Sequence, residues 1–488
     1  MRERNLPSPM PSQEVLQDGN PIPLVVDVDG TFVCGDVLLE GLARLLAAAP
    51  HKLFVLPLWL AAGRAALKRR VANAVPVLPE TLVLNPVVTD MIIEAQRMGR
   101  PVYLASAADE RYVAPLAEHI KADGFFASDG HTNMAGETKA QMLTDRFGEG
   151  GFDYIGNEWR DLAIWRRARH AIAVNVSPVL AKRIRAIDQD AQFMPRTAGR
   201  LQDFLEALRP HQWIKNVLVF APLIAAHMTD PHALGLAVVA FFSLSACASG
   251  SYLLNDILDL PHDRQHETKR HRPLASGRVP LAHAFFLALA LTLGGLASAA
   301  AVSIELLVMI ACYSLVTGAY SLYLKRKTFI DMVTLASLYT IRVLVGSAAV
   351  SIAVSPWFLA FSIFFFLALA IVKRQRELLR LRTAGKEKVS GRAYFVEDLP
   401  VLAAFAGSSS FASVVVLAFY LNSSKVIELY ARPELLWLLC PILIYWLGRM
   451  VLLANRGVVD DDPIVFALRD STSWLVGLAA AAVFAGAL

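Results

Sequence analysis

The sequence predicts two parts of different fold class, an N-terminal α/β doubly wound domain and a C-terminal all-α membrane bundle of about nine transmembrane helices. Short apolar runs alternate with helix-like stretches in the first 200 residues, a pattern typical of a doubly wound sheet. Beyond about residue 208 the chain is dominated by apolar segments of roughly 20 residues, the length needed to cross a bilayer. The composition agrees, since 55% hydrophobic and 18% charged residues are too apolar for an ordinary soluble protein.

The formal net charge of +5 lies wholly in the second part. Residues 1–200 hold 23 basic and 23 acidic side chains, whereas residues 201–488 hold 24 basic and 19 acidic ones. An apolar chain with so little charge is not disordered, and nucleic acid is not expected as a partner. The four cysteines form no C-x-x-C pair, so neither a disulfide framework nor a zinc site is expected. The N-terminal residues contain no apolar h-region, so no cleaved signal peptide is expected.

In the first part we expect a flexible lead-in over residues 1–21 and a folded domain over 22–204. Residues 36–75 are apolar with helical patterning, and a helix-like stretch precedes residue 100. Buried strands are predicted where apolar runs stand between these stretches, at 23–31, 100–106, 152–157 and 170–175.

The second part, residues 205–488, contains nine apolar segments, the first and last of them short or marginal for a span: about 216–229, 234–254, 283–301, 304–323, 329–350, 357–372, 399–421, 435–453 and 472–488. With nine spans the connections alternate between two sides. One set of loops holds 18 basic residues and the other holds two, Lys425 and Arg432. Because basic loops stay in the cytoplasm, we expect a multi-pass protein of the cell (inner) membrane, with its N-terminal domain cytoplasmic and its C-terminus outside.

A cluster of carboxylates follows the second segment, in the sequence SYLLNDILDLPHDRQHETKRHRPLASG. On a helix with roughly 100° per residue, Asn255, Asp256, Asp259 and Asp263 would all face one way, although Pro261 is expected to break the helix before Asp263. Three carboxylates on one face repel one another unless a cation lies between them, and Mg²⁺ bridging to a diphosphate is the natural partner. The alternative is a solvated acidic helix end.

This motif, with nine spans and a basic polar face, resembles the UbiA superfamily of intramembrane polyprenyl transferases over roughly 205–488. The resemblance implies that the Asp-rich motif binds Mg²⁺ and the diphosphate of the donor. Arg270 and Arg272, downstream, are candidate ligands of phosphate oxygens, or else ordinary topology charges. The second family motif, DxxxD, is reduced to Asp331, because Leu335 stands four positions later. The second metal site would therefore have one carboxylate.

Three further candidate substrate ligands flank Asp331 in the sequence, namely Tyr320, Lys325 and Arg342. An arginine inside a membrane span is costly and usually functional. For Arg342 the alternative is a salt bridge that holds the bundle together.

The sequence LRPHQWIKNVLVFAPL (208–223) resembles the opening of the bacterial decaprenyl-phosphate phosphoribosyltransferases, a branch of that superfamily. Those enzymes move 5-phosphoribose from phosphoribosyl pyrophosphate (PRPP) onto a polyprenyl phosphate. VKRQREL (372–378) and DDPIVFALRD (461–470) fit the same branch. Cations are needed to offset the repulsion between a lipid phosphate and a diphosphate donor. The candidates are Lys215, Lys373, Arg374 and Arg392, with plain topology charges as the alternative for the last three.

In the first part, DVDGT (27–31) after an apolar strand resembles motif I of the haloacid dehalogenase (HAD) phosphohydrolases. The resemblance implies that Asp27 is the nucleophile and Asp29 the general acid/base. Ser106 and Lys139 match the second and third motifs of that family. The roughly 75 residues between the first two motifs suit a helical cap.

The fourth HAD motif, GDxxxD, is represented by Asn157 and Asp161. The resemblance places both in a Mg²⁺ site together with Asp27 and Asp29. Asn157 stands where the family usually has a metal-binding aspartate, and a neutral ligand lowers the affinity for Mg²⁺. A HAD-like fold with weak or no phosphatase activity is therefore the alternative to an active phosphatase.

The leading hypothesis is a bifunctional Mg²⁺-dependent membrane enzyme. Its membrane half transfers 5-phosphoribose from PRPP to a polyprenyl phosphate for cell-envelope precursor synthesis, and its HAD-like half removes a phosphate from the product or a related metabolite. One alternative is a UbiA-type prenyltransferase that moves a polyprenyl group from its diphosphate to an aromatic or other small acceptor. A transporter or membrane scaffold is a third possibility, which the spacing of the carboxylate motif disfavours.

Overall fold

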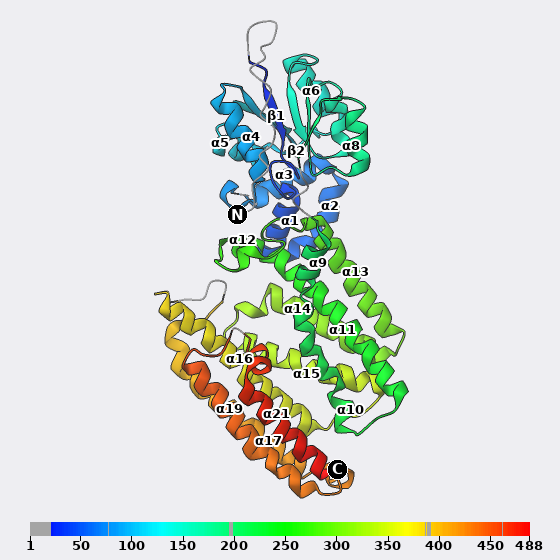
Figure 1. Cartoon of the computed structure of the whole chain (residues 1–488), viewed down its shortest axis with the longest axis vertical. Helices are drawn as coiled ribbons and strands as arrows, with labels where there is room; N and C mark the ends of the chain where they lie inside the picture. The colour runs from blue at the N-terminus through cyan, green and yellow to red at the C-terminus, as the bar shows by residue number, and fades with distance from the viewer. Residues whose placement is uncertain (1–20, 77, 195–198, 386, 388–391, 461) are drawn as a thin grey trace. The chain divides into compact units, whose positions relative to one another are not determined.

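The computed structural model describes residues 21–488 except 77, 195–198, 386, 388–391 and 461 (Figure 1). These residues form two compact units. The first takes in the chain up to Leu208 together with Tyr252–Ala288, and the second comprises Arg209–Ser251 and Leu289–Leu488. Apart from Pro21, the expected lead-in over 1–21 lies outside the described residues.

A parallel six-stranded sheet in the order β3-β2-β1-β4-β5-β6 forms the centre of the first unit (Figure 1). Its strands are β1 (Leu24–Asp27), β2 (Val102–Asp109), β3 (Gly124–Ser128), β4 (Asp153–Gly156), β5 (Ala171–Val174) and β6 (Gln192–Met194). The four strands predicted from apolar runs are confirmed, because they are the central ones and are buried on both faces. The edge strands β3 and β6 are only partly buried, so their sequences carry a weaker apolar signal.

Helices cover both faces of this sheet and enclose two separate cores. One core includes Ile92 of α4 and Leu116 of α5, and the other includes Leu143 of α6 and Leu180 of α8. The predicted doubly wound α/β class is thereby confirmed. The covering helices are α4 (Pro86–Arg97), α5 (Glu110–His119), α6 (Glu137–Phe147), α7 (Leu162–Trp165) and α8 (Pro178–Arg185).

The predicted helical stretch at 36–75 folds as three α-helices with a 3-10 turn, η1 (Pro50–Val55), between the first two. The helices are α1 (Val37–Ala48), α2 (Leu56–Ala61) and α3 (Arg64–Ala74). Asp36 caps α1, because its side chain accepts a hydrogen bond from Leu39 N at 2.9 Å. Lys68 of α3 donates to Ala107 O in β2 at 2.5 Å. This contact places the helical segment near the carboxyl end of the sheet.

The remaining elements of the first unit are α9 (Leu201–Leu208), α12 (Leu260–Gln265) and the 3-10 turns η2 (Pro79–Thr81), η3 (Trp159–Asp161) and η5 (Lys269–His271). Two long helices run through both units, α11 (Pro231–Leu258) and α13 (Leu281–Ala300).

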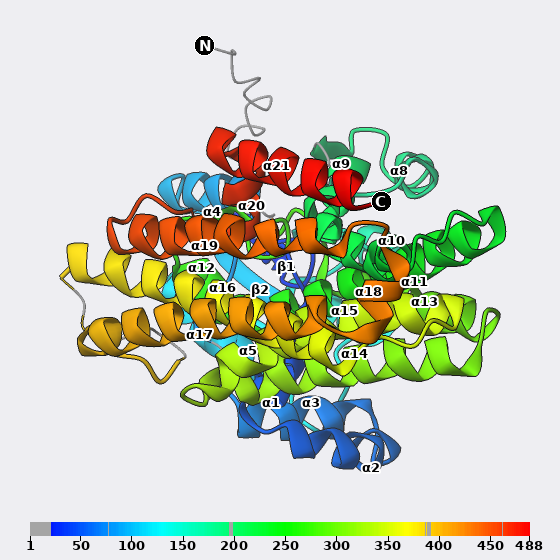
Figure 2. The ribbon, with the colours of Figure 1, turned by 90° about the horizontal axis from the view of Figure 1, so that it is seen from below.

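The second unit is helical throughout its described residues. Besides parts of α11 and α13, its long helices are α14 (Ile304–Leu322), α15 (Ile330–Val350), α16 (Pro356–Thr383), α17 (Leu399–Leu421), α19 (Leu439–Asn455) and α21 (Ser471–Ala487). The shorter ones are η4 (Pro210–Phe220), α10 (Ala221–Ala225), η6 (Leu324–Arg326), η7 (Val396–Asp398), α18 (Ser424–Leu429), η8 (Pro433–Leu438) and α20 (Pro463–Arg469). The helices α16, α17 and α19 lie side by side (Figure 2).

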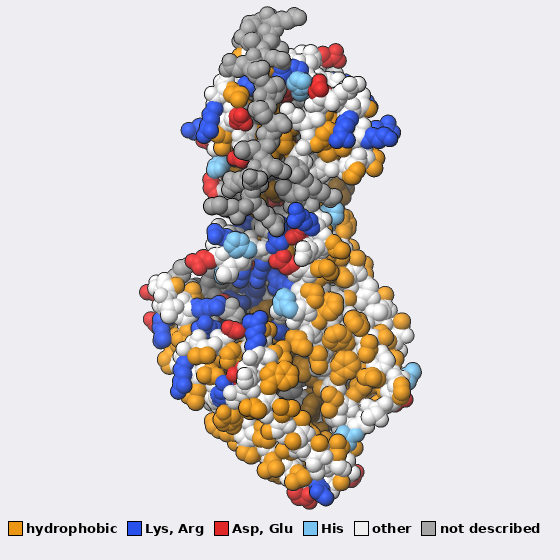
Figure 3. Space-filling view, in the orientation of Figure 1, with side chains coloured by type: hydrophobic (Ala, Val, Ile, Leu, Met, Phe, Trp, Pro, Cys, Tyr) orange, Lys and Arg blue, Asp and Glu red, His pale blue; other side chains and the backbone are white. Residues whose placement is uncertain are grey.

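Seven helices among the described residues are long and apolar enough to cross a membrane, and α20 with α21 makes an eighth candidate bent by 84°. The prediction of about nine spans is therefore close. The difference lies at 216–229, where η4 and the five-residue α10 replace a continuous helix. The face of the helical part shown in Figure 3 is mostly apolar, with lysine and arginine side chains gathered at one end.

Candidate functional sites

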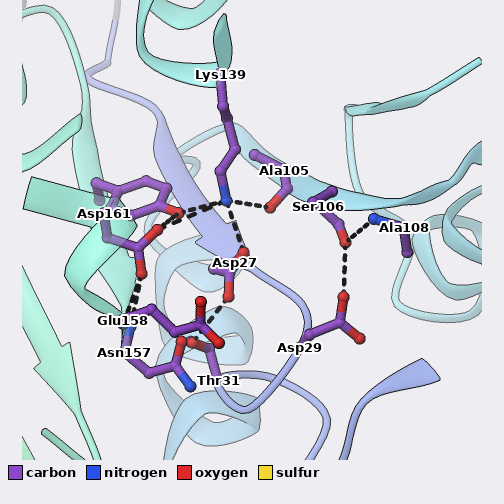
Figure 4. Close-up of polar contacts among 12 residues, drawn as sticks. Asp27, Asp29, Thr31, Ala105, Ser106, Ala108, Lys139, Asn157, Glu158 and Asp161 are labelled. Carbon is purple, nitrogen blue, oxygen red and sulfur yellow. Dashed lines mark hydrogen bonds and ion pairs between the residues drawn. The ribbon is translucent and has the colours of Figure 1, made fainter. Parts of the chain in front are cut away.

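The first candidate site lies where β1 ends, at the point in the sheet where strand connections leave in opposite directions (Figure 4). Asp27 is the last residue of β1, and its carboxylate accepts hydrogen bonds from Lys139 Nζ at 2.7 Å and Thr31 Oγ1 at 3.2 Å. Asp29 accepts from Ser106 Oγ at 3.2 Å and from Val37 N at 2.8 Å. The structure thus brings together Asp27, Asp29, Ser106 and Lys139, which the sequence motifs predicted as site residues. The first and last of them are 112 positions apart in the sequence.

The fourth motif closes the same site from β4. Asp161 accepts hydrogen bonds at 2.9 Å from Tyr154 Oη and from the backbone N–H groups of Asn157 and Glu158. Lys139 Nζ lies 3.7 Å from Asp161 Oδ1 and donates to Tyr154 Oη at 2.8 Å. Asp161 therefore holds the loop after β4 and the lysine in place.

Asn157 has a buried side-chain oxygen, Oδ1, that finds no hydrogen-bond partner among the described residues. Its amide lies over Gly30, where an added Cβ would come within 2.1 Å of Asn157 Nδ2. A buried carbonyl oxygen without a donor is costly unless a ligand satisfies it. Together with the carboxylates of Asp27 and Asp29, it supplies an all-oxygen ligand set of the kind that Mg²⁺ prefers.

Burial raises the pKa of both carboxyls at the end of β1, that of Asp27 in the strand and that of Asp29 in the loop after it. Burial, opposed in part by Lys139, raises the pKa of Asp27 to about 7. Burial and the negative charge of Asp36 raise the pKa of Asp29 to about 8. At neutral pH Asp29 is thus largely protonated and able to donate a proton, whereas Asp27 is ionised in a large fraction of molecules and faces a cation. This arrangement suits a nucleophile and a neighbouring general acid.

The second candidate site is the Asp-rich segment, also in the first unit. The helix α11 ends at Leu258, and α12 begins at Leu260 with Pro261 at its second position, so the predicted break before Asp263 is confirmed. Arg272 Nη1 lies 3.2 Å from Asp256 Oδ1 and 2.6 Å from Asp263 Oδ2. Two buried carboxylates of the motif already share one positive charge.

The other two residues of the motif form a separate pair, since Asn255 Nδ2 donates to Asp259 Oδ2 at 3.1 Å. Within the part of the chain that the structure describes, no three His, Cys, Asp or Glu side chains converge closely enough to hold a metal ion. Arg272 occupies the position of a cation between Asp256 and Asp263. Arg270, in η5, donates instead to the ring of His271 at 3.3 Å.

The third candidate site surrounds Asp331 at the start of α15 in the second unit. Its carboxylate is fully buried and pairs with the equally buried Arg374 of α16 at 2.5 Å. Tyr394 Oη donates to the same carboxylate. Arg392 Nη1 lies 3.8 Å from Asp331 Oδ2 and 3.6 Å from Glu377. Asp331, the single carboxylate of the reduced second motif, is thus held by two arginines and a tyrosine.

Two further polar groups lie inside the second unit. Lys215 of η4 forms an ion pair with Asp462. Burial raises the pKa of Asp462, but the positive charges of Lys215 and Lys373 outweigh it and hold that pKa below its usual value. Arg342 donates to Asn216 Oδ1 at 2.9 Å and to Leu338 O at 2.5 Å. These contacts tie η4 to α15 and to the segment before α20.

The structure also places Tyr320 in the last turns of α14, Lys325 in η6 and Lys373 in α16. Several residues that contact the predicted site residues were not assigned from the sequence, among them Thr31, Tyr154, Asn216, Glu377, Tyr394 and Asp462. Thr31 and Asp462 lie within the motifs DVDGT and DDPIVFALRD, and Asn216 follows Lys215 directly. Their closeness in sequence to predicted site residues could therefore have identified them. Tyr154 lies in an apolar strand and carried none.

The fold and the sites define a helical membrane protein with an α/β lobe in which two aspartates lie at the end of a central strand. The model of the UbiA prenyltransferase family matches residues 216–467, just over half of the chain. The chain belongs to the UbiA prenyltransferase family.

Three relatives are similar over different lengths. An uncharacterized protein of Sinorhizobium fredii is 34% identical over 96% of this chain and 91% of its own length. A nodulation protein, NoeC, of Azorhizobium caulinodans is 34% identical over 58% of this chain and 92% of its own. A decaprenyl-phosphate phosphoribosyltransferase of Mycobacterium tuberculosis is 36% identical over 40% of this chain and 67% of its own. The two-part arrangement therefore also occurs in another bacterial chain.

Among solved structures, a UbiA homologue from Archaeoglobus fulgidus bound to GPP and Mg²⁺ is 16% identical, covers 58% of this chain and 97% of its own, and has a TM-score of 0.45. A HAD family hydrolase from Salmonella enterica serovar Typhi is 16% identical, covers 36% of this chain and 68% of its own, and has a TM-score of 0.27.

Proposed function

We propose that the membrane half transfers 5-phosphoribose from PRPP to a polyprenyl phosphate during cell-envelope precursor synthesis. The observation that carries this proposal is that the second aspartate-rich motif has one carboxylate, Asp331, which lies beside two arginines, Arg374 and Arg392. A lipid phosphate acceptor needs such cations, whereas a neutral aromatic acceptor does not. The similarity to the phosphoribosyltransferase supports the same assignment.

In this proposal Asp256, Asp259 and Asp263 hold Mg²⁺ with the donor diphosphate, and Asn255 assists. The ion would neutralise the pyrophosphate as it leaves with the electrons of the C1–O bond. Arg272 then moves from the carboxylates to the phosphate oxygens, helped by Arg270. The lipid phosphate is bound by Lys215, Lys373, Arg374 and Arg392, and one of its oxygens attacks C1 of the ribose. Substrate binding is completed by Tyr320, Lys325 and Arg342. The cytoplasmic side is assigned to the basic loops and to the α/β lobe, which packs with 252–288.

We propose that the α/β lobe is a phosphatase that acts on the phosphorylated product or a related metabolite. Asp27 attacks phosphorus while Asp29 donates a proton to the departing oxygen, and Asp29 then takes a proton from the water that hydrolyses the aspartyl-phosphate. Ser106 and Lys139 hold the phosphate and the nucleophile. Asp27, Asp29 and Asn157 would hold Mg²⁺, which would neutralise phosphate charge, and Asp161 positions the loop that carries Asn157.

The deciding experiment supplies labelled PRPP and labelled prenyl diphosphate separately to membranes that contain the full chain. We expect label from PRPP to enter the lipid phase in a Mg²⁺-dependent way and to be lost in the Asp256→Asn variant. Label from prenyl diphosphate on a small acceptor would instead support a prenyltransferase, the second function that the family allows. Full activity of Asp256→Asn would contradict the metal assignment.

The phosphatase is tested on the phosphoribosylated lipid with purified full-length protein. We expect release of inorganic phosphate by the natural chain and none by the Asp27→Asn variant. If the natural chain releases no phosphate, or if Asp27→Asn releases as much, the proposed hydrolase role is wrong.

A further inference from the structure

Arg264 lies one residue beyond Asp263 of the Asp-rich segment and reaches into the α/β lobe within the first unit. Its Nη1 and Nη2 atoms donate to the two carboxylate oxygens of Glu40 at 2.8 and 2.9 Å. Nη1 also donates to Thr81 O at 2.7 Å, and Nε donates to Ala275 O at 3.2 Å. The guanidinium therefore joins α1, η2 and the loop after α12.

This pair is buried on both sides, since the Glu40 side chain is 3% exposed and that of Arg264 is 11% exposed. A two-point arginine–carboxylate contact fixes the geometry of both partners. Removing one partner leaves a buried charge uncompensated and is strongly destabilising. The pair therefore holds the segment at one place on α1.

Each partner lies a few residues from a candidate site. On α1, Val37 N, three residues before Glu40, donates to the carboxylate of Asp29 at 2.8 Å. On the other side, Asp263 precedes Arg264 directly and shares Arg272 with Asp256. A displacement of Arg264 would therefore move Asp263 relative to Asp256.

The far end of the same segment is also anchored to the first unit. Arg278 forms ion pairs with Asp203 at 2.6 Å and Glu206 at 2.8 Å, both in α9. Gly199 N donates to Arg278 O at 2.8 Å. The segment from Arg264 to Arg278 is thus fixed at both ends.

We propose that Glu40 and Arg264 are positioning residues that couple the α/β lobe to donor binding by the Asp-rich segment. The proposal rests on the proposed function, in which this segment binds Mg²⁺ and a diphosphate. It gives the lobe a second task besides hydrolysis, namely to hold Asp256 and Asp263 in the geometry that one cation can bridge.

The test uses the full chain in lipid nanodiscs and compares Glu40→Gln with the natural chain. Amide hydrogen exchange over 260–278 is expected to accelerate, and affinity for pyrophosphate with Mg²⁺ is expected to fall about 5- to 150-fold, the usual range of coupling between sites. The KM for PRPP is expected to rise by a similar factor with a smaller change in kcat. The double variant Glu40→Gln/Arg264→Gln is expected to be no worse than either single variant, because both charges are gone.

The matched control is Arg100→Gln. Arg100 pairs with Asp153 at 2.6 Å and is as buried as Arg264, but Asp153 keeps Arg169 as a second partner at 2.8 Å. This variant weakens the lobe without touching 260–278, so exchange there and pyrophosphate affinity should match the natural chain. If Glu40→Gln does not fold, Arg264→Lys, which keeps the charge but not the two-point contact, is expected to give a milder shift in the same direction.

The proposal would be overturned if hydrogen exchange over 260–278 and pyrophosphate affinity were unchanged in Glu40→Gln. It would also be overturned if both quantities changed as much in Arg100→Gln as in Glu40→Gln. If the natural chain binds Mg²⁺-pyrophosphate but takes no label from PRPP, PRPP is not the donor. In that case the hydrogen exchange over 260–278 and the pyrophosphate affinity of Glu40→Gln still decide whether the coupling exists. The two failures are therefore distinguishable.

Discussion

At the scale of single residues, the buried carboxylates of the two units are balanced by different partners. In the α/β lobe, Asp27 faces one lysine, and Asp29 accepts hydrogen bonds from two neutral donors, Ser106 Oγ and Val37 N. In the helical unit, Asp331 is paired with Arg374 and hydrogen-bonded to Tyr394. A carboxyl held by neutral donors takes up a proton more readily than one that is paired with an arginine. The lobe is thereby suited to proton transfer and the helical site to binding of charged groups.

The raised pKa of Asp29 predicts a pH-dependent stability of the metal-free lobe. In the folded lobe this pKa is about 8, against about 3.9 for an unperturbed aspartate, so the folded state binds more protons between these values. Stability is therefore full below about pH 4 and is lost as the pH rises through about 8. Because an asparagine side chain cannot ionise, the Asp29→Asn variant should raise the unfolding midpoint at pH 8 by several degrees, at about 2–4 °C for each 1 kcal/mol gained in a domain of this size, and by less at pH 5.

Scanning calorimetry of the full chain in EDTA at pH 5 and pH 8 measures this difference. The exposed Asp90 in α4 supplies the control, and Asp90→Asn should leave both midpoints unchanged. An equal gain from Asp29→Asn at the two pH values would show that its carboxyl is not the titrating group.

At the scale of elements, several contacts between candidate site residues lie at helix breaks and in the 3-10 element η4. The break between α11 and α12 leaves Asp263 beside Arg272, and the irregular η4 brings Lys215 to Asp462 and Asn216 to Arg342. The element η4 packs against α15 at Gly346, where a Cβ would lie 1.9 Å from Val219 O. Only glycine allows this approach of two backbones.

The Gly346→Ala variant is expected to push η4 away from α15 and to lower stability by about 1–3 kcal/mol, the usual cost of overpacking. Thermal unfolding in detergent measures the effect. Gly318→Ala in α14 is the matched control, because nothing lies within 4 Å of a Cβ there. A Gly346→Ala protein as stable as this control would show that η4 does not rest on α15.

At the scale of the whole molecule, charge and apolarity divide the chain into regions with different environments. The apolar helices carry few charges, and the loops on one side hold 18 basic residues against two on the other. The α/β lobe and 252–288 belong to one unit, although more than 40 residues separate them in sequence. We therefore expect the lobe and the connection between α11 and α13 to lie on the same side of a membrane.

Labelling of single cysteines tests this sidedness. In a background without Cys34, Cys247, Cys312 and Cys440, Lys425→Cys should react with a membrane-impermeant maleimide in intact cells. Thr383→Cys, at the C-terminal end of α16 next to the basic loop that follows it, should react only after permeabilisation. The reverse pattern would place the basic loops and the lobe outside.

Much of the fold and part of each site could be predicted from local sequence. The central strands, seven long helices, the break near Pro261 and the residues around Asp27 all follow from patterns within a few dozen positions. The edge strands β3 and β6 were not predicted, because the apolar runs in GFFAS and QFM are only two or three residues long. The contact of Arg272 with Asp256 and Asp263 could not be predicted either, because the sequence does not show whether a downstream arginine binds phosphate, carboxylate or water.

The sequence by itself therefore determined the kinds of element, their order and the chemical groups available, because hydrophobic periodicity, segment length and motif spacing are local properties. Only the tertiary structure decided which charges meet. Glu40 and Arg264 lie 224 positions apart, and Lys215 and Asp462 lie 247 apart. Such pairs depend on how strands and helices pack, and burial then fixes each partner, because a charge removed from water must find its opposite.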